Sequence, residues 1–159
     1  MSLSKPEYNS PRQAQPDNVL MASINFFSQK PRFRLSNPKK TSYWIKKTIE
    51  KEGASLISLN YIFCSDEYLA DINVRFLKHN TLTDIITFNY NPSKTEIEGE
   101  IYISVDRVRE NAQTFGTGFQ TELNRVIIHG VLHLLGYNDK TKSQKKAMRE
   151  KEDSYLSLR

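Results

Sequence analysis

Residues 127–139 place two histidines one helical turn apart and a carboxylate shortly after them. His129 and His133 are four residues apart, so a helix would project both imidazoles from one face. Every other residue from 126 to 135 is apolar or Gly, which predicts a helix buried in its domain. Buried imidazoles need polar partners, and one metal ion would satisfy both.

The residues that follow supply a third candidate ligand. Gly136 favours a left-handed turn at the end of the helix, and such a turn would bring Asp139 back toward the histidines. Three ligands and one open position are typical of a catalytic zinc site, whereas structural zinc sites usually have four protein ligands. We therefore predict one Zn²⁺ per chain, held by His129, His133 and Asp139. The alternative is that both imidazoles are hydrogen-bonded core histidines without a metal.

Gly130 limits the chemistry of this site. Metalloproteases with the H-E-x-x-H motif carry their general base directly after the first histidine, and this chain has Gly130 there. The pattern therefore keeps the metal ligands but lacks the base of a peptidase. Beyond water activated by the metal, the sequence assigns no catalytic group.

Four segments together resemble one known family. The run from His129 to Tyr137 is similar to the signature of the YbeY family, the bacterial endoribonucleases of rRNA maturation. Residues 83–88 and 99–103 resemble that family's T-D-V-L-S-F and G-D-I-x-I segments, and Met148 with Glu152 fits its M-x-x-x-E pattern. The resemblance implies a compact domain with a zincin-like metal helix, and a zinc-dependent endoribonuclease acting in rRNA maturation and ribosome quality control. The implied partners are an rRNA precursor and the ribosome or its small subunit.

The chain departs from the family's pattern at two positions. Asp139 stands where the family usually has His, and Asp is also a good zinc ligand. Leu77 stands where the family tends to carry Arg, and Leu cannot bind phosphate. Arg75 or Lys78 would have to replace that arginine, so we include both among the predicted substrate-binding residues.

Basic residues gather in two runs, and the formal net charge is +5. The run over residues 39–51 is typical of a solvated helix face. The second run begins directly after Asp139, where basic side chains beside a hydrolytic metal suit a polyanionic substrate. Its predicted RNA-binding members are Lys142, Lys145, Lys146 and Arg149. Single-stranded RNA is the expected substrate, because in-line chemistry needs a flexible backbone and duplex RNA is read mainly by shape.

Length and composition indicate one domain without a membrane segment. The chain has 159 residues, and residues 1–20 are rich in Pro, Ser, Asn and Gln, which predicts a disordered leader before a hydrolase domain at 21–159. No apolar run is long enough to span a bilayer. The single cysteine, Cys64, fits a reducing cytoplasm and is expected in the core.

The apolar pattern predicts an α+β fold. Strands are expected at 24–27, 32–35, 55–64, 84–90 and 98–105, the last two as a hairpin-like pair. Five helices are expected, at 38–52, 66–76, 105–115, 120–135 and 142–156, with Asn37 capping the first. Since strands and helices do not strictly alternate, a small mixed sheet is expected.

Two other functions stay open. The chain could be a ribosome-assembly binding factor whose metal site is mainly structural, and Leu77 favours this reading. It could also be a metal-dependent hydrolase of another substrate, although Gly130 argues against peptidase chemistry. The oligomeric state is not indicated.

Overall fold

The computed structural model describes residues 22–77 and 83–159, and a four-stranded mixed sheet forms its centre. The strands are β1 (Ser23–Ser28), β2 (Ser55–Cys64), β3 (Ile85–Asn89) and β4 (Glu96–Ser104), in the order β1-β2-β4-β3. β1 and β4 both pair with β2 in parallel, and β3 pairs antiparallel with β4. The predicted hairpin-like pair and mixed sheet are confirmed.

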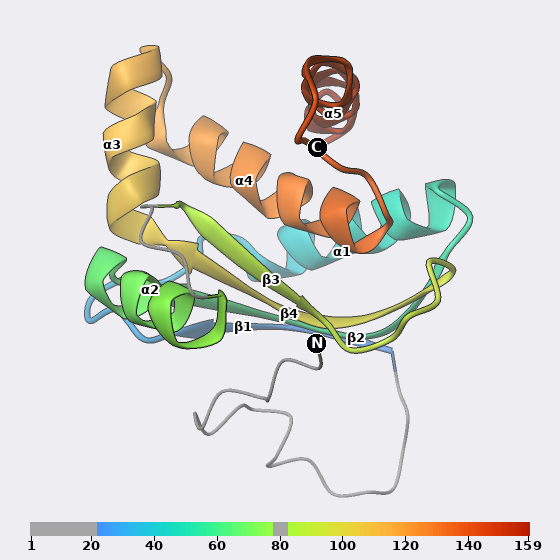
Figure 1. Ribbon diagram of the computed structural model, residues 1–159, viewed down its shortest axis with the longest axis horizontal. Coiled ribbons are helices and arrows are strands. Elements are labelled where there is room, and N and C mark those ends of the chain that lie inside the picture. The colour runs from blue at the N-terminus through green and yellow to red at the C-terminus, as the bar shows by residue number, and fades with distance from the viewer. Residues whose placement is uncertain (1–21, 78–82) are drawn as a thin grey trace, which may run out of the picture.

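Helices cover both faces of the sheet (Figure 1). α2 lies on one face, and the other helices lie on the opposite side, with α5 stacked outside α4 and α1 (Figure 1). The α-helices are α1 (Pro38–Lys51), α2 (Asp66–Ile72), α3 (Val105–Phe115), α4 (Phe119–Leu134) and α5 (Lys142–Leu156), and a π-helical segment, η2 (Asn73–Leu77), continues α2. The expected number of helices is therefore present in the described residues. None of these helices is long and apolar enough to cross a bilayer.

Alternation along β2 divides the apolar side chains between two cores. Tyr61 and Phe63 pack with residues of α1 and α4, whereas Ile62 and Cys64 pack with residues of α2 on the other face. The buried Tyr61 hydroxyl donates to the carbonyl oxygen of Ile127 at 3.0 Å, which ties α4 to the sheet. The core position predicted for Cys64 is confirmed.

The segment between β1 and α1 departs from the sequence-based prediction. Residues 32–35 form no strand, because Arg32 has a left-handed backbone (φ 66°) that interrupts an extended path. The apparent alternation arises because Phe33 and Leu35 pack against the core from an irregular loop. Asn37 does precede α1, but it has a left-handed backbone and its side chain makes no capping hydrogen bond. Pro38, with its fixed φ, therefore opens the helix without side-chain help.

The predicted leader, residues 1–20, lies outside the described residues, and so does Lys78.

Candidate metal centre

The end of α4 reverses the chain as its glycine predicts. Gly136 has φ 101°, its N–H donates to His133 O, and the N–H of Tyr137 donates to Leu132 O, each at 3.0 Å. These two bonds form a Schellman motif, which satisfies carbonyl groups at the helix end. α5 begins soon afterwards, with Thr141 in a capping box. Asp139 is thus held in a short connection between two well-capped helix ends.

This turn brings the three predicted ligands together. His133 Nε2 lies 2.9 Å from His129 Nε2 and 3.3 Å from Asp139 Oδ2, and His129 Nε2 lies 3.3 Å from the same oxygen. Ligands about 2.1 Å from a tetrahedral zinc ion would lie about 3.4 Å apart. Two imidazole nitrogens and one carboxylate oxygen at this spacing fit a single divalent ion, and these three residues are the group able to hold one among the described residues.

Glu152 fixes the orientation of His129. Its Oε2 lies 2.7 Å from His129 Nδ1, and its Oε1 accepts from Arg125 Nη1 at 3.1 Å. Arg125 also donates to Asp153 Oδ1 at 2.8 Å, and the Glu152 side chain is only 6% exposed. A proton on Nδ1, donated to Glu152, leaves the Nε2 lone pair of His129 facing His133 and Asp139.

The surrounding charges distinguish the two imidazoles. Burial disfavours the charged form of His129, but the hydrogen bond with Glu152 and the carboxylates of Asp139 and Asp84 outweigh burial and raise the pKa of this imidazole. Burial and the neighbouring His129 lower the pKa of His133, against the opposing effect of Asp139. Burial raises the pKa of the Asp84 carboxyl, which also interacts with His129. Several acidic groups thus surround His129, and a cation there would be stabilised by them.

Comparison with known proteins identifies the family. The family model for endoribonuclease YbeY matches residues 25–158. The chain belongs to the endoribonuclease YbeY family. It is 50% identical over 135 residues to an endoribonuclease YbeY of Amoebophilus asiaticus, with 85% of this chain and 92% of that protein covered. It is 48% identical over 137 residues to an endoribonuclease YbeY of Cytophaga hutchinsonii, with 86% and 96% covered.

A solved structure supports the fold. The solution structure of TM1509 from Thermotoga maritima matches with a TM-score of 0.61 and 28% identity, and the match covers 85% of this chain and 87% of that one. The sequence-based predictions of YbeY membership, of an α+β domain and of an endoribonuclease are confirmed at the level of the family.

Gly130 allows the metal helix to approach the sheet closely. A Cβ atom at this position would lie 2.9 Å from Ile85 Cδ1 and 3.0 Å from two carbon atoms of Ile101. The place that holds a catalytic Glu in H-E-x-x-H proteases therefore faces a packed apolar wall in this YbeY chain. The absence of the peptidase base follows from packing against β3 and β4.

The predicted substrate-binding residues occupy different settings. Arg75 is exposed and pairs with Asp71 at 3.1 Å, while Leu77 is partly buried and packs against the α2 core. The four predicted basic residues of α5, Lys142, Lys145, Lys146 and Arg149, are exposed. No contact of the described residues tests their binding to RNA, so their role stays a prediction.

Two residues near His129 were not predicted to have a role: Glu152, which contacts His129, and Arg125, which contacts Glu152. Glu152 was noted only as part of the M-x-x-x-E pattern, and Arg125 was not noted at all. Glu152 and His129 are 23 residues apart on different helices, so only the packing of α5 on α4 shows their contact. A charged residue on the buried face of α5, beside Met148, was the available signal.

Proposed function

We propose that this protein is a zinc-dependent endoribonuclease that cleaves single-stranded segments of rRNA precursors in the cytoplasm, in rRNA maturation and ribosome quality control. The cluster of His129, His133 and Asp139 in a chain of the YbeY family carries this proposal. When bound, a divalent ion supplies Lewis-acid polarisation of a phosphoryl oxygen and lowers the pKa of water.

The ligand chemistry supports zinc. Two neutral imidazoles and one carboxylate, with one coordination position left open, are typical of catalytic zinc. Glu152 contributes by holding the His129 ring so that its Nε2 lone pair is directed at the cluster. The acidic surroundings of His129 add electrostatic stabilisation for a dication.

Charge near the centre supports an RNA substrate. α5 begins three residues after Asp139 and carries exposed basic residues in its first two turns, where they would bind phosphates on both sides of the scissile bond. Single-stranded segments suit the reaction, since an unpaired backbone can adopt the in-line geometry. The ribosome or its small subunit would present such segments.

The test uses the metal-loaded protein with end-labelled rRNA fragments of single-stranded and duplex form. We expect cleavage of the single-stranded fragment, loss of cleavage with a chelator, and loss of cleavage in Asp139→Ala. Glu150→Ala removes an exposed carboxylate of α5 and serves as the matched control, with cleavage expected to persist. Equal cleavage by Asp139→Ala and the wild type would refute the proposal.

One observation favours a second candidate, a ribosome-assembly binding factor. Leu77 occupies the position of the family's arginine and packs against the α2 core, so it offers no phosphate contact. Tight binding of rRNA by metal-loaded protein without any cleavage would support this function instead.

A further inference from the structure

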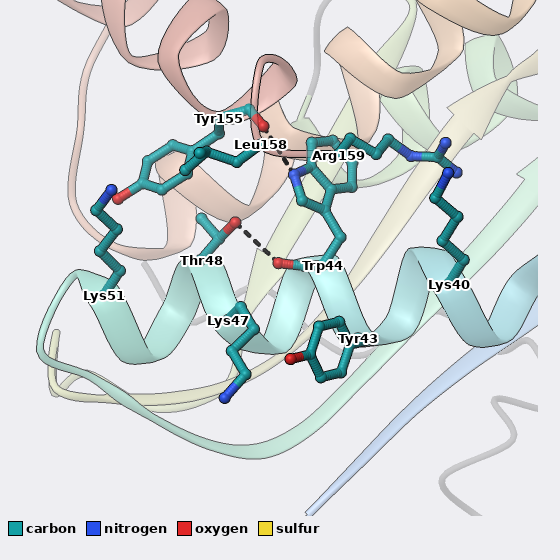
Figure 2. A pocket seen from close by; sticks show the side chains of 9 residues that line it. All are labelled: Lys40, Tyr43, Trp44, Lys47, Thr48, Lys51, Tyr155, Leu158 and Arg159. Atoms are coloured by element: carbon teal, nitrogen blue, oxygen red, sulfur yellow. Dashed lines mark hydrogen bonds between the residues drawn. The ribbon is translucent and has the colours of Figure 1, made fainter.

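A groove lies on the side of α1 (Figure 2). It lies between α1 and the C-terminal end of α5, and it encloses about 270 Å³. None of the residues that line it belongs to the cluster of His129, His133 and Asp139. The basic run of residues 39–51 supplies three lysines to its lining, and the metal centre gives that run no role.

The charge of the groove is positive. Lys40, Lys47, Lys51 and Arg159 line it, and no carboxylate side chain of the described residues does. The three lysines are spaced seven and four residues apart and so extend over about 16 Å of α1. Lys40 and Lys51 extend toward the side on which Arg159 and Tyr155 lie, and Lys47 extends the other way, beside Tyr43 (Figure 2). Lys47 also pairs with Glu50 at 3.3 Å, but both side chains are about half exposed, and such a pair is easily displaced. A polyanion that runs along α1 would meet all four cations.

Aromatic rings lie between these cations. Tyr43 is 65% exposed, and Lys47 Nζ lies 5.5 Å from the centroid of its ring. The Arg159 guanidinium lies 5.4 Å from the Trp44 ring, whose Nε1 donates to the Tyr155 carbonyl oxygen at 2.8 Å (Figure 2). Trp44 is only 4% exposed, so Tyr43 is the ring of this groove that can stack on a base. Grooves bind single-stranded nucleic acid with phosphates on cationic side chains and bases on exposed rings of this kind.

The Arg159 side chain is held beside α1 by one hydrogen bond. Its Nη2 donates to Thr41 Oγ1 at 2.8 Å, but its Nε is a buried donor atom that finds no acceptor among the described residues. Buried donors are nearly always paired in native proteins.

We propose that this groove is a second RNA-binding subsite, which holds a single-stranded segment of the substrate while the metal centre acts on another. A base stacks on Tyr43, and the adjoining phosphates bind Lys40 and Lys47. A duplex does not fit this description, because its bases are not available for stacking on a side chain. The proposal rests on the proposed endoribonuclease function and adds a contact that positions the strand.

Trp44 provides a direct signal for the test. It is the only tryptophan of the chain, and its ring lines the groove, so its fluorescence reports occupation there. The holoprotein is titrated with a labelled single-stranded oligonucleotide, whose integrity is checked on a gel, and binding is followed by anisotropy and by Trp44 fluorescence. We expect both signals to saturate together.

The groove variants are Tyr43→Ala and the double variant Lys40→Gln with Lys47→Gln, all at exposed positions. Loss of one stacked base should weaken binding roughly 5- to 100-fold. Loss of two phosphate contacts should lower the slope of log affinity against log salt by about 1.4. The matched control, Lys39→Gln with Lys46→Gln, removes the same charge from the same helix outside this groove and should change the slope less.

The possible failures are distinguishable. Equal affinity and salt slope in the groove and control variants, with wild-type cleavage intact, would overturn the subsite and leave the endoribonuclease proposal standing. A wild type that neither binds nor cleaves RNA would overturn both. Polyglutamate serves as a model of an acidic protein. If it changes Trp44 fluorescence and RNA does not, the RNA subsite is overturned in favour of an acidic protein partner.

Discussion

Glu152 should control metal affinity although it is not a ligand. Its carboxylate accepts from His129 Nδ1 and from Arg125 at once, at 2.7 and 3.1 Å. Glu152→Gln keeps the size of the side chain but replaces one acceptor oxygen with an NH₂ group, which is a donor. That NH₂ group would face a donor of either the His129 imidazole or the Arg125 guanidinium, and one of the two hydrogen bonds would be lost. Loss of such an outer partner typically lowers metal affinity 10- to 100-fold, which corresponds to about 1.4 to 2.7 kcal/mol.

The assay is competition for zinc with a chromophoric chelator, together with denaturant unfolding of the metal-loaded protein. Glu152→Gln should weaken zinc binding by about this factor, and Glu152→Ala should also lower the free energy of unfolding by about 1 to 3 kcal/mol, since it strands buried polar groups. Asp153→Asn is the matched control, because Asp153 is the other, 58% exposed carboxylate of Arg125. It should leave zinc affinity unchanged and cost less than about 1 kcal/mol. Wild-type zinc affinity in Glu152→Gln would refute the reasoning.

Three further predictions follow from the structure. Gly130→Glu recreates H-E-x-x-H but drives a carboxylate against Ile85 and Ile101, so the free energy of unfolding in denaturant should fall by about 3 kcal/mol or more. A peptidase assay of this variant should show no activity. A free energy of unfolding like that of the wild type would contradict the close packing. Zinc affinity by competition should stay near the wild-type value in Asp139→His and fall in the order Asp139→Asn, then Asp139→Ala; if Asn equals Asp, Asp139 only caps the turn. Burial raises the pKa of the Cys64 thiol to about 12, so thiol reagents should label the native protein negligibly at neutral pH and label it fully in denaturant, whereas fast native labelling would place Cys64 outside the core.

The helices were predictable because their ends carry strong local signals. Residues 105–115 and 142–156 were predicted with the observed bounds, since Ser104 and Thr141 cap their starts and Gly116 follows the first of them. The strand predicted at residues 32–35 was wrong for a physical reason. Phe33 and Leu35 are apolar because a loop packs them against the core, and alternation alone cannot distinguish that from a strand.

The ligands were predictable for the same reason, and their supporting residues were not. His129, His133, Gly136 and Asp139 lie within eleven residues, so helix periodicity and one glycine turn fix their arrangement. Glu152 and Arg125 act across the contact between α4 and α5, and the groove forms where Arg159 returns to α1. These contacts depend on how helices distant in sequence pack together, which one sequence does not show.

A metal ion bound by His129, His133 and Asp139 is central to the proposed function. Elemental analysis of protein never exposed to a chelator tests this most directly, with His129→Ala and the exposed Glu150→Ala measured beside the wild type. We expect about one zinc per chain in the wild type and in Glu150→Ala, and a large loss in His129→Ala. A substoichiometric metal content in the wild type that stays unchanged in His129→Ala would contradict the account.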